Sequence, residues 1–270
     1  GTYNSTREKN LALNGIAYQV LQILSKNGDS LADNFHIIVN DHGDYAFDVE
    51  EGFTLNRFRA DVYGEAQIDN LSDEQKNATA AQMMDYLTGS NGFSIVLYGK
   101  DAYTDEELAA HSLPKELTKQ EILEIAIMRY QLNTNSFKKY MPVTIATNVS
   151  EKSVAAIKEN QSALQGIDIV EDSTRQYVED ESMAPILGYT GQASSEELET
   201  LRKDNPDYSN DAIVGKAGIE QYMELQLQGK DGEETVTVDN LGKVLDIDNS
   251  KTVEPIAGND VYLTIDSDWQ

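Results

Sequence analysis

Glycines recur at turning points between residues 175 and 232, and their placement is the feature that most constrains the fold. Gly188 and Gly191 bracket the sequence GYTG, which follows the apolar residues 185–187. Glycine suits sharp turns because it has no Cβ and adopts positive φ without strain. We therefore expect residues 185–187 to end a strand that reverses sharply at GYTG.

Two helices are expected after this turn. Ser194 and Glu197 form an S-x-x-E capping box, which predicts a helix that begins after Ser194. Gly215 and Gly218 flank the start of the second helix, and Gly229 closes it, as glycine commonly does at a helix end. Strand, turn, helix and helix therefore follow one another in this stretch.

This stretch resembles the N-terminal pedestal, or dimerisation, domain of class B penicillin-binding proteins. The family pattern has an Arg-x-Tyr, an L-G-Y-x-G turn, an S-x-E-E-L helix, and a G-K-x-G-(I/L)-E motif opening a helix that ends in G-K-D-G. The matching residues are Arg175, Tyr177, Leu187, Gly188, Tyr189, Gly191, Gly215, Lys216, Gly218, Ile219, Glu220, Gly229, Lys230, Asp231 and Gly232. All of them except Leu187, Ile219, Lys230 and Asp231 make up the structural and interaction motif that the resemblance implies. The sequence departs from the pattern at Met223, where the family has an aromatic residue, and at Gln228, where it has an arginine.

The resemblance extends back to residue 129. Residues 141–146 are similar to the family's Tyr-Pro-Val-x-(I/L)-A strand, and residues 166–170 to its Leu-x-Gly-(I/V)-x-(I/V) strand. Between them, Ser150 is expected to cap a helix over residues 154–159. Apolar residues alternate with threonines in the first segment and follow helical spacing in the second, so the residue pattern agrees.

The N-terminal part predicts helices and one hairpin. Apolar residues recur at helical spacing over residues 13–24, and Asn27-Gly28 supplies a stop. Residues 35–39 and 45–49 predict a hairpin around a polar turn, and residues 53–58 an additional extended piece.

Further helix starts follow along the chain. Ser72, Thr79 and Thr104 are expected to cap short helices in an acidic region. Thr118 with Glu121 caps a stronger amphipathic helix over residues 122–129, after which residues 130–140 break the helical period. Near the C-terminus, Val236 and Val238 face Val244 and Ile247 across a glycine-bearing turn, which predicts a second hairpin.

Charge and cysteine content exclude several classes of function. The chain carries 47 acidic and 21 basic residues, a net charge of −26, which would repel nucleic acids and anionic membrane surfaces. The absence of cysteine excludes disulfides, thiolate metal sites and cysteine nucleophiles. No apolar run approaches the roughly 20 residues of a membrane helix.

The resemblance implies an α+β fold: an elongated, pedestal-type dimerisation domain with a helical and hairpin head lobe. We expect residues 1–130 to hold the head lobe with the first pedestal helix, 131–260 the pedestal core, and 261–270 the start of a truncated transpeptidase domain. The chain begins without methionine and stops inside what looks like a strand entering that domain, as we expect for a piece of a longer protein.

In function, the resemblance implies a non-catalytic pedestal on the extracytoplasmic side of a bacterial membrane. It would hold a serine D,D-transpeptidase domain that cross-links peptidoglycan. The implied partners are its own C-terminal transpeptidase domain, a SEDS-type glycan polymerase and cell-wall scaffold proteins, with the membrane reached only through an N-terminal anchor. No catalytic residue, cofactor or metal ligand is expected within this chain.

Three alternatives remain open at this point. A free-standing serine enzyme would use Ser136, with Lys139 one helical turn away to accept the proton, but the accompanying Ser-x-Asn and Lys-Thr-Gly motifs are misordered or incomplete. A peptidoglycan-binding module would use the scattered tyrosines for sugar stacking. Arg175 would bind either a carboxylate of a neighbouring domain or a local partner.

Overall fold

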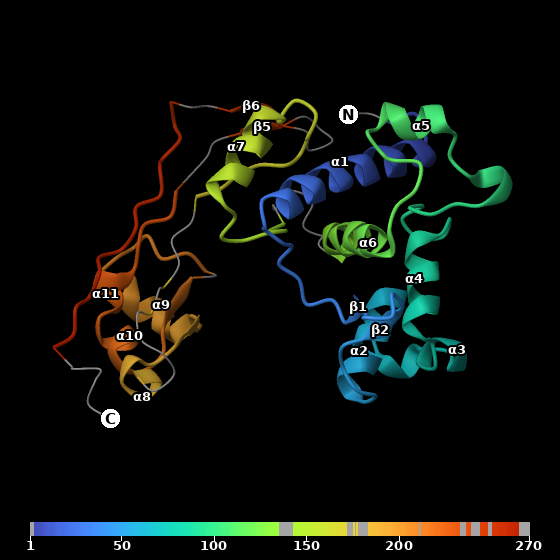
Figure 1. Cartoon of the computed structure of the whole chain (residues 1–270). Coiled ribbons are helices and arrows are strands. Elements are labelled where there is room, and N and C mark those ends of the chain that lie inside the picture. The colour runs from blue at the N-terminus through green and yellow to red at the C-terminus, as the bar shows by residue number, and fades with distance from the viewer. Residues whose placement is uncertain are drawn as a thin grey trace. The chain divides into compact units, whose positions relative to one another are not determined.

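The computed structural model describes residues 3–134, 143–171, 175, 177, 183–210, 212–232, 236–238, 244–247 and 250–264 (Figure 1). The chain forms two compact units, Gly1–Ile169 (unit 1) and Val170–Gln270 (unit 2). Helices and short antiparallel strand pairs make up the described residues, which confirms the α+β class. The predicted domain divisions at residues 130 and 260 stay predictions. They separate functional lobes, whereas units 1 and 2 are defined by the contacts within each of them.

Unit 1 consists mainly of helices around one hairpin. Its elements are α1 (Thr6–Lys26), β1 (Ile37–Val39), β2 (Tyr45–Phe47), α2 (Phe53–Tyr63), η1 (Ile68–Asn70), α3 (Asp73–Lys76), α4 (Ala80–Thr88), η2 (Gly99–Asp101), α5 (Asp105–Ala110), α6 (Lys119–Thr134) and α7 (Glu151–Glu159). Helix α1 packs on α6 and α7, and α6 also contacts α4 and β1. In Figure 1, α6 is seen end-on below α1.

The two elements predicted first along the chain are confirmed. Helix α1 begins at Ser5, whose Oγ accepts a hydrogen bond from the Glu8 N–H, and it ends at Asn27. Gly28 follows with a φ of 80°, a backbone conformation that glycine adopts without strain. Strands β1 and β2 pair antiparallel, with Ile37 opposite Phe47.

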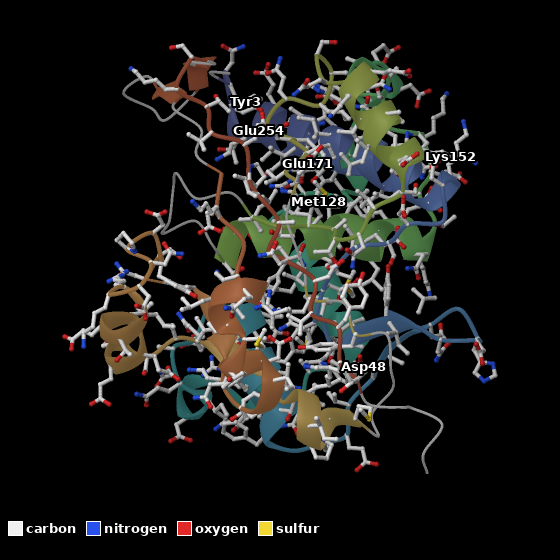
Figure 2. All side chains as sticks on the ribbon, turned by 90° about the vertical axis from the view of Figure 1, so that its left-hand side faces the viewer. Tyr3, Asp48, Met128, Lys152, Glu171 and Glu254 are labelled. Atoms are coloured by element: carbon white, nitrogen blue, oxygen red, sulfur yellow. The ribbon has the colours of Figure 1, made fainter. Side chains whose placement is uncertain are left out.

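The core of unit 1 is apolar and draws on most of these elements. Leu24, Ile37, Leu55, Met83, Met84, Ile125 and Met128 are almost completely buried. Met128, labelled in Figure 2, belongs to α6 and lies within this core. Burying each such side chain contributes about 1.5–3 kcal/mol to folding, so this cluster is the main source of stability in unit 1.

The helix starts predicted at Ser72, Thr79 and Thr104 are confirmed, each with a capping box, and Thr118 caps α6 in the same way. Each of these hydroxyl oxygens accepts a backbone N–H three residues on. Such a cap is worth about 1 kcal/mol.

Two predictions about helical segments of unit 1 are wrong for a tertiary reason. Residues 53–58, expected to be extended, belong to helix α2, because Leu55, Phe58 and Val62 share one face that is buried in the core. Helix α6 continues to Thr134 where a break at residue 130 was expected; the ring of Tyr130 packs at 5.3 Å from that of Phe35. Residues 135–142 lie outside the described part of the chain.

Helix α7 and its Ser150 cap are confirmed, but the strands expected beside it are not. Residues 143–146 and 166–170 carry no strand in the described structure, and residues 141–142 are not described. The Ile145 carbonyl accepts one hydrogen bond, from the Ala32 N–H, and Ile167 and Ile169 pack on the unit 1 core. Burial of alternate apolar residues therefore occurs here without a strand ladder.

Unit 2 contains short elements. They are α8 (Ala184–Leu187), β3 (Thr190–Gln192), α9 (Ser195–Leu201), β4 (Ile213–Gly215), α10 (Gly218–Tyr222), α11 (Glu224–Leu227), β5 (Val236–Val238) and β6 (Val244–Ile247). Strand β3 pairs antiparallel with β4, and β5 with β6, so the second predicted hairpin is confirmed. The capping box of Ser194 and Glu197 is confirmed at the start of α9.

Residues 185–187 form the end of helix α8, and the strand predicted there is wrong. Pro185 occupies the first turn of α8, where a missing N–H costs no intrahelical hydrogen bond. The strand begins after the turn, at Thr190, and the Tyr189 carbonyl accepts a hydrogen bond from the Lys216 N–H. Gly188, with a φ of 83°, ends α8, whereas Thr190 and Gly191, which were predicted to lie in the turn, belong to β3.

Candidate functional site

An arginine and two buried glutamates form the centre of the predicted motif in unit 2. Glu220 on α10 and Glu224 on α11 are four residues apart and each is 4% exposed. Arg175 donates from Nε to Glu220 Oε2 at 2.9 Å, and its Nη2 lies 3.7 Å from Glu224 Oε2. Arg175 Nη1 donates to the Leu227 carbonyl at 2.7 Å. We call Arg175, Glu220 and Glu224, together with Tyr177 and Tyr208, the Arg175 cluster.

Two tyrosines complete the cluster. Tyr177 donates its hydroxyl to Glu220 Oε1 at 2.9 Å, and Tyr208 donates to Glu224 Oε1 at 3.0 Å. Burial, and then the bond to the glutamate, raises the pKa of both tyrosines above the usual value. Because phenols that stay protonated remain donors, both carboxylates keep their hydrogen bonds across the physiological pH range.

Each carboxylate oxygen in the cluster accepts a hydrogen bond. The remaining one, Glu224 Oε2, accepts the Gly215 N–H at 2.7 Å. The cluster thus joins the Arg175–Tyr177 segment, strand β4, the loop of Tyr208 and helices α10 and α11. Buried carboxylates that are fully hydrogen-bonded and paired are suited to holding segments in place.

Three of the motif glycines allow backbone segments to touch. At Gly188, with φ 83°, a Cβ would lie 1.9 Å from the Ala217 carbonyl oxygen. At Gly218, with φ 60°, it would lie 2.4 Å from the Ile186 oxygen, and at Gly215 it would lie 2.2 Å from the backbone of Glu220. Only glycine permits these approaches, and they seat α8 against the start of α10.

The last two motif glycines contact the segment that follows β6. A Cβ at Gly229 would lie 2.5 Å from the Ile256 carbonyl oxygen, and one at Gly232 would lie 2.8 Å from Pro255. Lys230 and Ile256 exchange backbone hydrogen bonds of 2.7 and 2.9 Å. The segment that follows β6, which we call the returning segment, is therefore hydrogen-bonded directly to the end of the motif.

The other motif residues have separate positions. Lys216 donates from Nζ to Glu197 Oε2 at 2.6 Å, and Gly191 lies against the Lys216 side chain. The lysine, and then the Ser194 N–H, lowers the pKa of Glu197 to about 2. Tyr189 is 63% exposed and lies outside the Arg175 cluster.

Several residues of this cluster were not identified from the sequence. Glu224 and Tyr208 were missed, as was the pairing of Glu197 with Lys216. The available signal was the spacing of Glu220 and Glu224, because two acids four residues apart share one face of a helix. Among the described residues, Arg175 binds Glu220, lies near Glu224 and binds the Leu227 carbonyl.

In unit 1, the buried Arg129 has neutral partners. Arg129 donates from Nη2 to Asn10 Oδ1 at 2.9 Å and from Nη1 to Asn14 Oδ1, and its guanidinium lies 5.1 Å from the Phe93 ring centroid. Burial lowers the pKa of Arg129 to about 10. Asn14 Nδ2 donates in turn to the carbonyls of Phe93 and Ser94, both at 3.1 Å. This layer ties α1 and α6 to the loop after α4.

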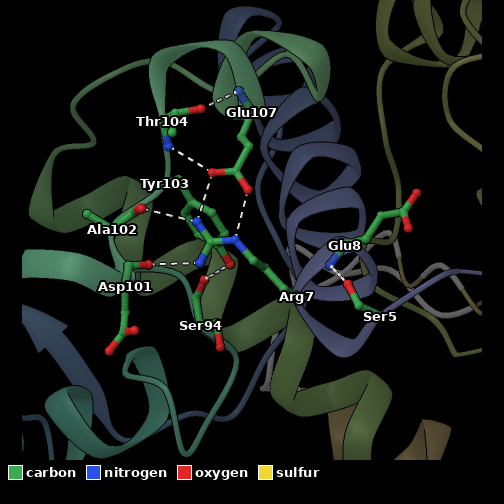
Figure 3. Close-up of polar contacts among 9 residues, drawn as sticks. All are labelled: Ser5, Arg7, Glu8, Ser94, Asp101, Ala102, Tyr103, Thr104 and Glu107. Atoms are coloured by element: carbon green, nitrogen blue, oxygen red, sulfur yellow. Dashed lines mark hydrogen bonds and ion pairs between the residues drawn. The ribbon is translucent and has the colours of Figure 1, made fainter.

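A third arginine holds the next part of that loop (Figure 3). Arg7 donates to Glu107 in a two-pronged pair, with both distances 2.8 Å, and to the carbonyls of Asp101 and Ala102 at 2.8 and 3.1 Å. Arg7, and then the Thr104 N–H, lowers the pKa of Glu107 to about 2. A bidentate pair is geometrically specific, so it fixes the backbone at residues 101–102 relative to α1.

A metal site and a Ser136 nucleophile are the other kinds of chemistry to consider, and only the first falls within the described residues. These ranges contain no group of three or more His, Cys, Asp or Glu side chains arranged to hold a metal ion. His36 Nδ1 lies 3.0 Å from Asp48 Oδ1. Ser136 falls outside the described residues. Within the same ranges, no helix has the length and apolarity needed to cross a membrane.

Comparison with known proteins identifies a family. The sequence profile described as "Penicillin-binding Protein dimerisation domain" matches residues 9–263. Similar proteins include the "Peptidoglycan D,D-transpeptidase MrdA" of Salmonella typhimurium strain LT2, 34% identical over 145 residues, and that of Escherichia coli K12, 33% identical over 130 residues. These alignments cover 53% and 47% of this chain and 23% and 20% of the relatives.

A more distant relative and one solved structure also match. "Penicillin-binding protein 3" of Bacillus subtilis is 27% identical over 163 residues, which cover 57% of this chain and 23% of that protein. The solved structure of penicillin-binding protein 2B from Streptococcus pneumoniae strain 5204 matches with a TM-score of 0.38 and 22% identity, covering 95% of this chain and 35% of that one. This chain therefore spans less than a quarter of the length of the curated relatives it matches.

Proposed function

The chain belongs to the dimerisation-domain family of the class B penicillin-binding proteins, and from this premise we propose that it is a non-catalytic pedestal. It holds a D,D-transpeptidase domain on the extracytoplasmic side of a bacterial membrane, above an N-terminal anchor. The family match over residues 9–263 is the observation that carries this proposal. In this proposal the activity belongs to the longer protein, and the relatives are named as D,D-transpeptidases.

The geometry of unit 2 supports a mechanical role. The last residues of α11 face the Arg175 cluster and the returning segment together: Arg175 binds the Leu227 carbonyl, and the Asn259 N–H donates to the Gln226 carbonyl at 2.8 Å. A Cβ at Gly258 would lie 1.9 Å from the Leu227 oxygen. Residues 255–259 are thus seated on the same helix end that Arg175 holds, which suits a segment leading into a catalytic domain.

The proposed partners are the transpeptidase domain of the same protein, a SEDS-type glycan polymerase and cell-wall scaffold proteins. The motif residues of unit 2 would position the first of these. The polar side chains of the Arg175 cluster are hydrogen-bonded to one another. We therefore assign Arg175, Glu220 and the motif glycines to positioning the transpeptidase domain. Surface residues would make the partner contacts.

The test replaces Arg175 by alanine in the longer protein. Fluorescent penicillin should still acylate the catalytic serine at the wild-type rate, because that serine lies in another domain. Cross-linking of new peptidoglycan by the membrane-embedded protein with its polymerase should fall, because the domain is no longer held in position. Unchanged cross-linking would count against the pedestal role.

Two measurements on the chain by itself separate the alternatives. A covalent penicillin adduct, seen as a mass shift, would show that the chain is a serine enzyme. Co-sedimentation with purified cell walls would show that it is a peptidoglycan-binding module. The pedestal role predicts that neither occurs.

A further inference from the structure

Unit 1 has a groove of about 650 Å³ between α4, α6, strand β2 and the loop that follows α4. Its floor includes Met84, Val96, Leu97 and Ile122, of which Met84 is 1% exposed and belongs to the core. The groove lies far along the sequence from the family motif in unit 2. The proposed pedestal function assigns no role to this groove, so a role for the groove is independent of that function.

Two tyrosines line the groove in different ways. Tyr45 is half-buried and donates its hydroxyl to the Lys119 carbonyl at 3.2 Å, so its ring is fixed. Burial, and then the charge of Asp85, raises the pKa of Tyr45 to about 12. Tyr98, in contrast, is 81% exposed, and its ring is available to a ligand.

The groove also carries two exposed carboxylates, Asp85 on α4 and Asp101 in η2. Within the described ranges, neither carboxylate forms a hydrogen bond or an ion pair. In Figure 3 the backbone oxygen of Asp101 is bound by Arg7, while its carboxylate extends away from that network. Because Arg7 fixes this backbone, the side of the groove that carries Asp101 is preorganised for a ligand.

The one lysine that lines the groove is already engaged. Lys119 donates from Nζ to the Gly43 carbonyl at 2.7 Å and to Asp44 Oδ1 at 3.2 Å, at the tip of the β1–β2 hairpin. Its ammonium lies 5.5 Å from the Tyr45 ring centroid. Since Asp44 offsets this cation, Asp85 and Asp101 leave the groove with negative charge in a chain whose net charge is already −26.

We propose that this groove binds a lysine- or arginine-bearing segment of a partner protein. The aliphatic stem of the basic side chain lies along the apolar floor, and its cationic head lies near Asp85 and Asp101 beside the Tyr98 ring. Long basic side chains combine an apolar stem with a charged head, and cations are attracted to the face of an aromatic ring. A phosphate-bearing or carboxylate-rich ligand is disfavoured by the same charges.

The binding test uses the full chain and a fluorescein-labelled octapeptide of alternating lysine and leucine, measured by fluorescence anisotropy. The matched probe carries Nε-acetyl-lysine at each lysine, which keeps the stem and removes the charge. Acetylation should weaken binding by about tenfold or more, since it removes both the ionic and the cation–π contributions. Equal binding of the two probes would overturn the proposal.

Two double variants distinguish binding in the groove from general attraction of a basic peptide to an acidic protein. Asp85→Asn with Asp101→Asn removes the two groove carboxylates and should weaken binding about fivefold. Glu116→Gln with Asp69→Asn removes two exposed carboxylates of unit 1 outside the groove, and it should leave the affinity within about twofold. An equal loss in both double variants would show that the overall charge attracts the peptide, and would overturn the proposal.

The Tyr98 ring and the Met84 side chain give two further readouts. Tyr98→Ala should weaken binding a few-fold, whereas Tyr98→Phe, which keeps the ring, should not. With methyl-labelled methionine, the Met84 resonance should shift on peptide addition and that of Met128, which is buried in the core away from the groove, should stay in place. A shift at Met128 without one at Met84 would place the peptide elsewhere. Displacement of the peptide by a neutral N-acetylglucosamine tetramer would make the groove a sugar site and overturn the proposal.

Discussion

Units 1 and 2 are stabilised by different kinds of contact. The apolar core of unit 1 gathers residues from α1, β1, α2, α4, α6 and α7. The buried apolar cluster of unit 2, within its described residues, consists of Leu198, Tyr208, Ala212 and Val214. Where little apolar surface is buried, paired charges and close backbone contacts must define the fold.

Two arginines, Arg175 and Arg129, illustrate this difference. Arg175 in unit 2 lies between two carboxylates, whereas Arg129 in unit 1 binds amide oxygens and an aromatic ring. Removing Arg175 leaves two buried negative charges four residues apart. Removing Arg129 leaves only neutral groups in a large apolar core, so the same substitution should have a smaller effect in unit 1.

The largest effect is expected at Gly188. Gly188→Ala places a Cβ 1.9 Å from the Ala217 oxygen at a φ of 83°. Left-handed strain and overpacking together should lower the free energy of unfolding by about 4 kcal/mol. The matched control is Gly64→Ala in unit 1, which has a φ of 77° and open space around the new methyl group, and should cost about 1 kcal/mol. Urea denaturation of both variants measures the contrast; similar costs would mean that backbone contact in unit 2 matters little.

The next largest effect is expected for Arg175→Met. Loss of the cation leaves Glu220 and Glu224 buried without a counter-charge, at a cost of about 3 kcal/mol in the free energy of unfolding. Adding Glu220→Gln to this variant should recover about 1 kcal/mol, because one of the unpaired charges is removed. Thermal or urea unfolding checks both values. A double variant less stable than the single one would contradict the role given to charge.

Arg129→Met should cost less, about 2 kcal/mol, since it leaves amide oxygens of Asn10 and Asn14 without a donor but no buried charge. Adding Asn14→Leu removes one of these oxygens and should restore part of the loss. Urea denaturation compares these variants with Arg175→Met. If Arg129→Met proved the more destabilising, the contrast between the two units would be wrong.

The smallest effect is a pH dependence that the two units share. Glu107 and Glu197 have folded-state pKa values of about 2, below the usual 4.5, because Arg7 and Lys216 bind them. The stabilisation is present above pH 4.5 and is lost as the pH falls to about 2, since the unfolded state takes up the proton first. Glu107→Gln and Glu197→Gln should each be less stable at neutral pH and lose less stability over this window. Glu116→Gln, at an exposed acid, should follow the wild-type curve.

Much of the local structure was predictable because it depends on neighbours in sequence. The capping boxes at Ser72, Thr104 and Ser194 and the helix start at Thr79 are confirmed, as are helices α1 and α7 and both hairpins. Several of the errors lie where tertiary packing decided the conformation. Residues 53–58 became helical because one face of that segment packs into the core. Ile145, Ile167 and Ile169 pack against the same core, partly buried, without pairing in strands.

Two of the capping-box glutamates, Glu107 and Glu197, show what the sequence by itself determined and what it did not. The spacing of Thr104 and Glu107, like that of Ser194 and Glu197, is enough to predict a helix start, because the hydrogen bonds span three residues. The cation bound by each glutamate comes from a distant segment: Arg7 is 100 residues from Glu107, and Lys216 is 19 from Glu197. The same holds for the Arg175 cluster, whose motif residues were identified one by one. Glu224 and Tyr208 joined it only through folding, because a hydrogen bond depends on distance in space and no periodicity in the sequence records which distant donor will meet a given acceptor.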